Sequence, residues 1–511
     1  MFWKYSHQTH PQQLDHLLDN KDVTLKQLLD EEDVLQECRA QNKKLIEFLI
    51  RPEIMEELVT LTIVEPIVRS GDGDGTEAPD EFTMYKYPNT ACELLACDIP
   101  TLNERLAGDE VLMRKLYSFL EAEPPLNPLL ASFFARTLGV LLTRNSPEQL
   151  TCLQVLEFLK SREDFISLLL RHMGTSAIMD LMFKLFTSVE GDEMKLNLLN
   201  WLNGQQVVQR LVSLFDPSVD AERHSNVSHL LCNVISKCRD YAAQAETRPP
   251  STNLILKAIE SRETVSTILE LMLSDGPNGE KSKSAICSGI PVLLEILDYN
   301  HNSQDNALGG IGSGLLNRDG DNPASVEEHK LIVEEFVQAV VPFLPKLHAL
   351  LLDPRPQKDT VEPLEEMLNA PLGATRLEVA KLICALIATH SPVIDSCLIK
   401  LKTIQLLLDL FRQYTWNNFL HTQVEHAVAL ALDVPKNKTN EENIKVEIRE
   451  WKSNENLSKV EATEDNSETK TDSVSVDEEM QQDKVAEVIP EENKETERTE
   501  EDINETSLVH H

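Results

Sequence analysis

Apolar residues recur at helical spacing along most of this chain. One stretch carries them at i, i+3, i+4, i+7, i+8 and i+11, namely Ile178, Leu181, Met182, Leu185, Phe186 and Val189. The pattern returns within residues 227–238 and 379–387, and in a last stripe of Ile404, Leu407, Leu408 and Phe411. Each stripe lies on one face of a helix and must be covered by neighbouring helices. No segment shows strand-like alternation, so the sequence predicts an all-α fold.

Helix start signals support this interpretation. Thr24-Leu-Lys-Gln27 has the form of a capping box, and Asn127-Pro128 and Ser146-Pro147 each place a cap residue before a proline. Short helices joined by short loops favour a HEAT/armadillo-like helical-repeat solenoid, in which paired helices recur at roughly 40 residues. No repeat is visible in the sequence itself. The prediction therefore depends on helix spacing, and an irregular helical bundle is the alternative.

Three segments interrupt the helical pattern. Residues 70–80 (SGDGDGTEAPD) and 300–323 are rich in glycine and polar residues, and both are expected to be flexible insertions. The third segment, 435–511, has 23 Asp or Glu against 10 Lys or Arg, and Trp451 is its only aromatic residue. Such a composition buries too little apolar surface to offset the entropy of ordering. The predicted domains are therefore a helical-repeat domain at 1–434 and a disordered acidic tail at 435–511.

Composition limits the classes of partner and compartment. A net charge of −37 argues against binding to nucleic acid, which needs clustered Lys and Arg. No run of about 18 apolar residues is evident, so no membrane insertion is expected. The N-terminus lacks a secretory apolar region, which predicts a cytoplasmic or nuclear protein. The nine cysteines form no Cys-x-x-Cys pair, and free buried thiols of a reducing compartment are expected.

Motifs for chemistry are weak throughout. Gly310-Ile-Gly312-Ser-Gly314 lacks the lysine of a phosphate-binding loop and is interpreted as a linker. The aspartate pairs at 72 and 74 and at 319 and 321 lack the last glutamate of a calcium loop. The histidine pairs at 224 and 229 and at 421 and 426 are five residues apart, whereas helical metal ligands normally sit four apart. No catalytic residue, cofactor or metal is predicted, and the chain is not expected to be an enzyme.

Two segments are candidates for contact with a partner protein. The first combines Tyr414, Trp416, Asn417, Asn418, Phe419 and His421 in one short stretch. Aromatic and amide side chains are typical of interface hot spots. In the alternative interpretation, Trp416 and Phe419 seal a junction between helices, while Asn417 and Asn418 cap them. The second segment is Glu31, Glu32 and Asp33, an acidic contact for a basic partner or, alternatively, favourable charge at a helix N-terminus.

Several segments resemble one protein family in order along the chain. They are Asp22–Leu49, Tyr85–Leu95, Leu126–Phe134, His172–Leu181, Arg223–Ser228, Leu372–Leu377 and Gln413–Glu425. Together they are similar to the SAPS family, the regulatory subunits of protein phosphatase 6. The resemblance implies a non-catalytic, helical-repeat scaffold that binds the catalytic subunit of a protein phosphatase 6-type serine/threonine phosphatase. It also implies a role in substrate choice and an ankyrin-repeat regulatory subunit as a second partner.

A second class of function remains open from the residues alone. A helical-repeat adaptor for trafficking or nuclear transport has the same periodicity, although a transport groove would need repeated Trp-x-x-x-Asn ladders. Only Trp201 and Trp416 lie in the helical region beyond Trp3. The chain also departs from the family where it turns acidic after Val434-Pro435, which resembles a truncated or alternatively spliced form. The last stripe, Val424, Val428, Leu430 and Leu432, is then expected to lack a covering helix, and docking is expected to be weaker.

Overall fold

A computed structural model describes residues 11–20, 22–66, 81–143, 150–189, 192–244, 254–298, 323–352 and 371–432. The chain divides into two units, Met1–Lys452 and Ser453–His511, and all described residues belong to the first. The expected insertion at 70–80, the predicted tail at 435–511 and the Ser146-Pro147 start signal lie outside the described residues. So does the insertion at 300–323, apart from Pro323, which begins a helix.

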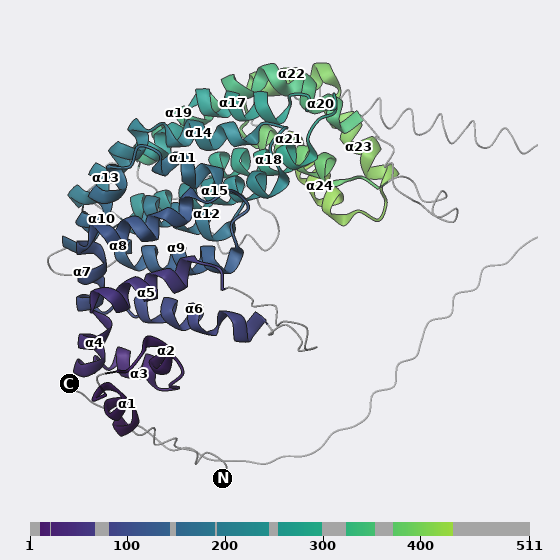
Figure 1. The fold of residues 1–511 in the computed structure, drawn as a ribbon. Helices are drawn as coiled ribbons and strands as arrows, with labels where there is room; N and C mark the ends of the chain where they lie inside the picture. The colour runs from purple at the N-terminus through teal and green to yellow at the C-terminus, as the bar shows by residue number, and fades with distance from the viewer. Residues whose placement is uncertain are drawn as a thin grey trace, which may run out of the picture. The chain divides into compact units, whose positions relative to one another are not determined.

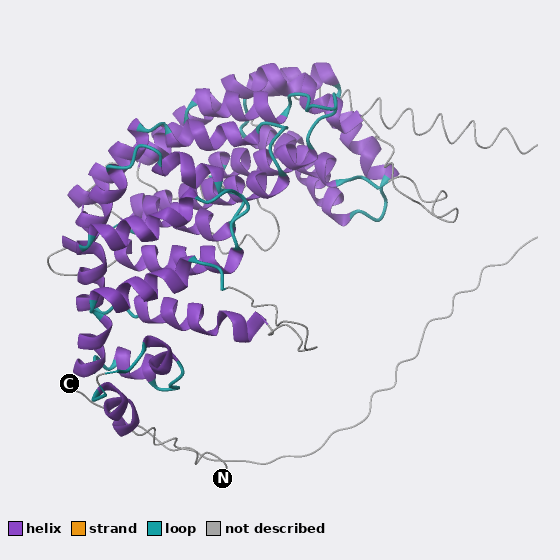
Figure 2. Cartoon of the chain, viewed as in Figure 1, coloured by secondary structure: helices purple, strands orange, loops and turns teal. Residues whose placement is uncertain are grey.

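The described residues form α-helices joined by turns and short 3-10 segments (Figure 2). Their only β-type pairing is an isolated bridge between Asp275 and Lys281. The prediction of an all-α fold is therefore confirmed. The Thr24 capping box is present as predicted, because the Thr24 hydroxyl accepts from the Gln27 amide and the Gln27 side chain accepts from the Thr24 amide.

Every third helix belongs to one continuous row (Figure 1). The helices of this row, each in contact with the next, are α6 (Glu81–Leu95), α9 (Pro128–Thr143), α12 (Ser176–Thr187), α15 (Ala221–Gln244), α18 (Lys283–Leu297), α21 (Ala374–Ala388) and α24 (Asn418–Leu432). The chain leaves the row after each member and returns two helices later. The repeating unit is thus three helices, and the prediction of helix pairs is corrected, while the helical-repeat solenoid is confirmed.

The intervening helices pack on the row and on one another. They are α7 (Pro100–Gly108), α8 (Glu110–Tyr117), η1 (Ser118–Glu121), α10 (Leu150–Lys160), α11 (Phe165–Arg171), α13 (Asp192–Gly204), α14 (Val207–Val212), η2 (Ser213–Phe215), α16 (Leu254–Glu260), α17 (Arg262–Met272), α19 (Pro323–Val340), η5 (Val341–Phe343), α20 (Leu344–Leu352), α22 (Pro392–Leu401) and α23 (Thr403–Gln413). Before α6, the chain forms α1 (Pro11–Leu18), α2 (Leu25–Leu29), α3 (Val34–Arg39), α4 (Lys43–Leu49) and α5 (Pro52–Ile63).

The apolar stripes read from the sequence form most of the core. The six residues of the stripe at 178–189 are all buried, as are Val227, Leu230, Val234 and Ile235 on α15. The last stripe is different at its end, because Phe411 is 36% exposed. Five of the nine cysteines are buried, the other four are half-buried, and all nine are free. In α24, Val424 is buried, Val428 and Leu430 are half-buried and Leu432 is exposed.

One described stretch, His329–Leu352, is long and apolar enough to cross a membrane by length and composition. It is not an uninterrupted apolar run, because Glu334, Glu335 and Lys346 lie within it. The stretch belongs to the helical stack, however, because α19 packs on α17 and α20 packs on α21. Its residues Phe336, Leu344 and Leu347 are fully buried. A core helix of this kind needs no bilayer to cover its apolar surface.

Arg239 ties three helices together. From α15, its guanidinium donates to Glu260 Oε1 on α16 at 2.8 Å and to the carbonyls of Glu295 and Ile296 on α18 at 2.7 and 2.8 Å. The side chains of Arg239 and Glu260 are only 16% and 8% exposed. Loss of Arg239 therefore removes the ion pair and three helix-linking hydrogen bonds from a largely buried position.

We expect Arg239→Met to lower the free energy of unfolding by about 3–5 kcal/mol, measured by urea denaturation. The double variant Arg239→Met/Glu260→Leu should recover part of this loss, because both charges are then removed. Equal stability of Arg239→Met and the unchanged chain would contradict this role.

His329 provides a pH-dependent contribution. Burial, followed by the charge of Arg239, lowers the pKa of His329 to about 4. An unfolded histidine titrates near pH 6.5, so between about pH 6.5 and 4 the unfolded chain binds a proton that the folded chain does not. The free energy of unfolding should therefore fall as pH drops through this window, by up to about 3 kcal/mol from this group. His329→Gln should remove that part of the slope in urea titrations, and an unchanged slope would refute the assignment.

Candidate protein-interaction surface

Six of the seven segments that resemble the SAPS family contain residues of the row helices, and five of them lie where a row helix starts. Five of them contain the first turns of row helices: Leu126–Phe134 at α9, His172–Leu181 at α12, Arg223–Ser228 at α15, Leu372–Leu377 at α21 and Gln413–Glu425 at α24. Tyr85–Leu95 lies within α6. Asp22–Leu49 spans α2–α4, of which α2 and α3 contact α6. These five segments are far apart in the sequence, but each lies at the equivalent position of its own layer.

Polar side chains in these segments link one layer to the next. Asn127 caps α9 by accepting from the Leu129 amide at 3.0 Å, and its Nδ2 donates to the Tyr85 hydroxyl on α6 at 2.9 Å. His172 Nε2 donates to the Leu120 carbonyl at 2.9 Å, and burial lowers the pKa of this imidazole. These hydrogen bonds give Asn127 and His172 a structural role within the helical stack.

The same applies to the start of α15. Arg223 Nη2 donates to the Arg171 carbonyl at 2.7 Å, and Asn226 Nδ2 donates to the Met173 carbonyl at 2.8 Å. His224 is fully buried, and its Nε2 donates to the Asp216 carbonyl at 3.0 Å while its Nδ1 bonds the Ser284 hydroxyl at 2.8 Å. His224 is therefore a structural residue, as the spacing of the histidine pair indicated.

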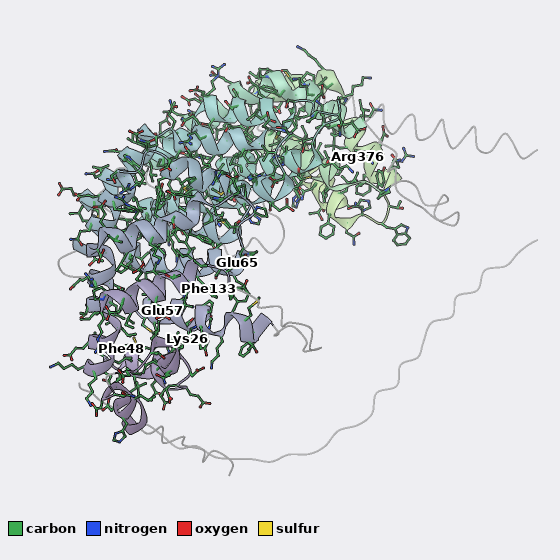
Figure 3. The ribbon with its side chains drawn as sticks, in the orientation of Figure 1. Lys26, Phe48, Glu57, Glu65, Phe133 and Arg376 are labelled. Atoms are coloured by element: carbon green, nitrogen blue, oxygen red, sulfur yellow. The ribbon has the colours of Figure 1, made fainter. Side chains whose placement is uncertain are left out.

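Arg376 connects α21 to the segment before α24. This arginine, labelled in Figure 3, is 8% exposed. Its Nε donates to the Leu372 carbonyl at 2.7 Å, and its Nη2 donates to the Tyr414 hydroxyl at 3.0 Å. The guanidinium also lies 5.2 Å from the centroid of the Tyr414 ring. Tyr414 is itself 8% exposed. Tyr414 thus belongs to the core, although the sequence placed it among the candidate partner contacts.

We define the ridge as residues 414–423. Two of its aromatic side chains do not pack in the core. Trp416 is 94% exposed and Phe419 is 76% exposed. The interpretation that these rings seal a junction between helices does not hold, because sealed rings would be buried. Asn418 is also exposed. Their contact with a partner protein stays a prediction.

Other residues of the ridge have contacts within the helical stack. Asn417 is the residue before α24, and its Oδ1 accepts from the Leu420 amide at 3.0 Å, which confirms the capping interpretation for Asn417. His421 stacks on Phe411 with ring centroids 3.9 Å apart, and its Nε2 donates to the Phe411 carbonyl at 3.1 Å. Phe411, read from the sequence as part of a core stripe, is the platform for His421.

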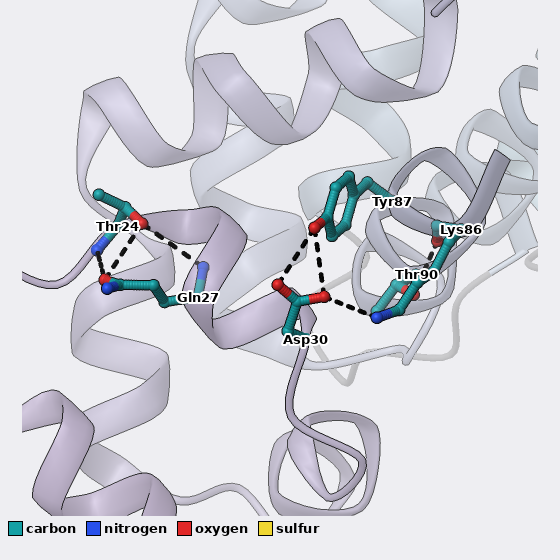
Figure 4. A network of polar contacts seen from close by, with 6 residues as sticks. All are labelled: Thr24, Gln27, Asp30, Lys86, Tyr87 and Thr90. Carbon is teal, nitrogen blue, oxygen red and sulfur yellow. Dashed lines mark hydrogen bonds and ion pairs between the residues drawn. The ribbon is translucent and has the colours of Figure 1, made fainter. Parts of the chain in front are cut away.

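The second candidate, the acidic turn Glu31–Asp33, connects α2 to α3. Glu32 is exposed, Glu31 and Asp33 are half-buried, and Asp33 precedes α3 without a side-chain capping bond. The neighbouring Asp30 is engaged instead, accepting from Lys86 Nζ at 2.6 Å and from the Tyr87 hydroxyl at 3.1 Å (Figure 4). The Lys86 ammonium lowers the pKa of Asp30. The contacts of Asp30 do not involve Glu31, Glu32 or Asp33, so the partner contact and the favourable charge at the N-terminus of α3 both stay predictions.

Sequence reasoning missed two features of the helical stack, one beneath the ridge and one away from it. Arg376 carried no signal beyond its place in a family-like segment, because its partner Tyr414 is distant in sequence. Phe82, in the first turn of α6, is 83% exposed, which a helical apolar pattern does not indicate. Within the described ranges, no group of three or more His, Cys, Asp or Glu residues is arranged to hold a metal ion.

The two classes of aromatic residue in the ridge should differ in stability. Tyr414→Ala should lower the free energy of unfolding by about 3–5 kcal/mol, because it removes a buried ring and the acceptor for Arg376. Trp416→Ala and Phe419→Ala should each change it by less than about 0.5 kcal/mol, because both rings are exposed. Urea denaturation separates the cases, and a large loss for Trp416→Ala would show that the ring is buried in solution.

Comparisons with known proteins identify the family. The family model described as SIT4 phosphatase-associated protein, SAPS, matches residues 149–476. The chain is 42% identical over 439 residues to serine/threonine-protein phosphatase 6 regulatory subunit 3 of Gallus gallus, covering 86% of the chain and 47% of that protein. It is 42% identical over 433 residues to regulatory subunit 2 of Homo sapiens, covering 84% and 41%. The chain spans about half the length of the curated relatives it matches.

Two solved structures share a low similarity with the chain. An engineered protein has a TM-score of 0.26 at 13% identity, covering 77% of this chain and 97% of its own. A SYS-1/POP-1 complex has a TM-score of 0.23 at 13% identity, covering 85% and 84%. TM-scores this low do not support a fold assignment. The fold assignment depends instead on the arrangement of the helices. The family model matches more than half of the 511 residues, and the chain therefore belongs to the SAPS family of SIT4 phosphatase-associated proteins.

Proposed function

We propose that this chain is a non-catalytic regulatory subunit that binds the catalytic subunit of a protein phosphatase 6-type serine/threonine phosphatase. One observation carries the proposal: residues 149–476 match a family described by its association with a phosphatase. Relatives with 38–42% identity are named protein phosphatase 6 regulatory subunits, which supports the same assignment. The hydrolysis of phosphoserine and phosphothreonine then belongs to the partner.

The fold is suited to this role. A stack of helical layers presents a long surface on which a catalytic subunit and its substrates can be held side by side. The proposal includes direction of substrate choice, and an ankyrin-repeat subunit as a second partner, as the family resemblance implies. It also includes a cytoplasmic or nuclear location, where such a phosphatase would meet its substrates.

Reconstitution tests the proposal directly. Purified chain mixed with a purified protein phosphatase 6-type catalytic subunit should elute as a single complex in size-exclusion chromatography, with light scattering giving the mass of one copy of each. The chain alone should release no phosphate from a phosphothreonine peptide, whereas the complex should. A helical-repeat protein of unrelated sequence is the matched control for non-specific association.

Affinity purification followed by mass spectrometry provides the test in cells. The tagged chain should recover the phosphatase catalytic subunit above the level of the control. Recovery of transport factors or vesicle-coat proteins without any phosphatase would contradict the proposal and favour an adaptor for trafficking or nuclear transport. Failure to form the purified complex would contradict it independently.

A further inference from the structure

We propose that the catalytic subunit of the phosphatase docks on the ridge at residues 414–423, with Trp416 and Phe419 as the two anchoring side chains. The inference rests on the proposed function and assigns its contact surface. Trp416 and Phe419 are the two most exposed large apolar side chains among the described residues that the family model matches. They lie three residues apart, with Trp416 in the turn before α24 and Phe419 in the first turn of α24.

The ridge differs in charge from the rest of the chain. Residues 413–424 contain no Asp, Glu, Lys or Arg, whereas 26% of the whole chain is charged. An exposed, uncharged run with aromatic rings is poorly matched to water and well matched to an apolar pocket on a folded partner. Asn418, which is exposed beside Phe419, adds an amide that both donates and accepts hydrogen bonds. A globular enzyme offers such pockets, whereas a flexible acidic or basic peptide does not.

The two anchors are also held on a rigid base. Tyr414 is fixed by Arg376, Asn417 caps α24, and His421 stacks on Phe411. These contacts leave little backbone freedom between Tyr414 and His421. Aromatic anchors presented in a fixed position lose little entropy when a partner binds, which is the arrangement that interface hot spots share.

The charge of the neighbouring row favours a phosphatase as the occupant. The seven row helices contain nine Lys or Arg and eight Asp or Glu, whereas the whole chain contains 48 and 85. The acidic excess therefore lies elsewhere. A phosphate group adds a charge of about −1.5 to −2, so phosphorylated substrates are repelled by an acidic surface. Because α24 is the last member of this row, an enzyme docked at its start adjoins helices that together carry no acidic excess.

Lysines on the row support this approach for anionic substrates. Lys237 and Lys283 are exposed, and Lys184 is half-buried, with its Nζ in close contact over Gly139 of α9. They come from three successive row helices, α12, α15 and α18. None of them is needed to hold the anchors, so they can be changed independently of the ridge.

Binding of the full chain to the purified catalytic subunit, measured by isothermal titration calorimetry, tests the proposal. The double variant Trp416→Ala/Phe419→Ala should raise the Kd by at least about 30-fold, as expected for two hot-spot residues. The melting temperature should stay unchanged. Phe82→Ala is the matched control, because Phe82 is 83% exposed and lies outside the family match at 149–476, and its Kd should not change.

Two further measurements address the mode of contact. Quenching by acrylamide should report Trp416 as accessible in the free chain and protected in the complex, with Trp416→Phe identifying its contribution among the four tryptophans. Because the ridge is uncharged, raising the salt concentration should change the Kd much less than the double variant does. A steep salt dependence would indicate the acidic turn Glu31–Asp33 instead and would overturn the proposal.

The possible outcomes distinguish a failure of the proposed function from a failure of the proposed docking site. If the unchanged chain does not bind the catalytic subunit, the proposed function fails. If the unchanged chain binds and the double variant binds equally well, only the docking site is wrong. Self-association of the unchanged chain that the double variant abolishes, seen by light scattering, would assign the ridge to a second copy and would also overturn the proposal.

Discussion

Lateral stacking of the row helices is the constraint on which the rest of the structure depends. A helix with a wide apolar stripe cannot be stable alone in water, and each row helix is covered by the next. One glycine allows close packing within a layer. A Cβ at Gly289 on α18 would lie 2.7 Å from Met272 Sδ on α17, so the absence of a side chain at this position makes room for Met272.

The polar bonds that lead into the row helices fix how the layers are offset. A purely apolar contact between helices tolerates sliding, because dispersion and burial have little direction. The bonds from Arg223 to the Arg171 carbonyl, and from Arg376 to the Tyr414 hydroxyl, do have direction. This is consistent with the position of five of the seven family-like segments, which are distant in sequence and lie at the starts of row helices. Much of the resemblance that identifies the chain reflects architecture rather than a binding site.

The sequence predicts the individual helices but not how they pack against one another. The stripe at 178–189 and the capping box at Thr24 depend on residues close in sequence, so local physics predicted both. The three-helix unit depends on which stripes meet across layers, and local periodicity holds no information on that. Phe411 shows the limit at one residue. Its spacing matches the core stripe, but its ring lies at the edge of the stack, where His421 covers one face.

The candidate surface could be predicted as a segment but not as a set of side chains. An aromatic and amide cluster is visible in the sequence, yet Tyr414 and Trp416, two residues apart, have opposite environments at 8% and 94% exposure. The difference arises because Arg376, from the preceding layer, binds one ring and leaves the other outside.

This arrangement couples the exposed surface to the stack beneath it. The residues that flank Trp416 and Phe419 are bound by contacts from α21, α23 and α24, so the backbone that carries the two rings depends on the packing of the last layer. Loosening that layer would move the anchors without changing either of them. Under the proposed docking, the packing of the last layer would set the separation of the two rings, and a rigid partner pocket accepts two rings only at the correct separation.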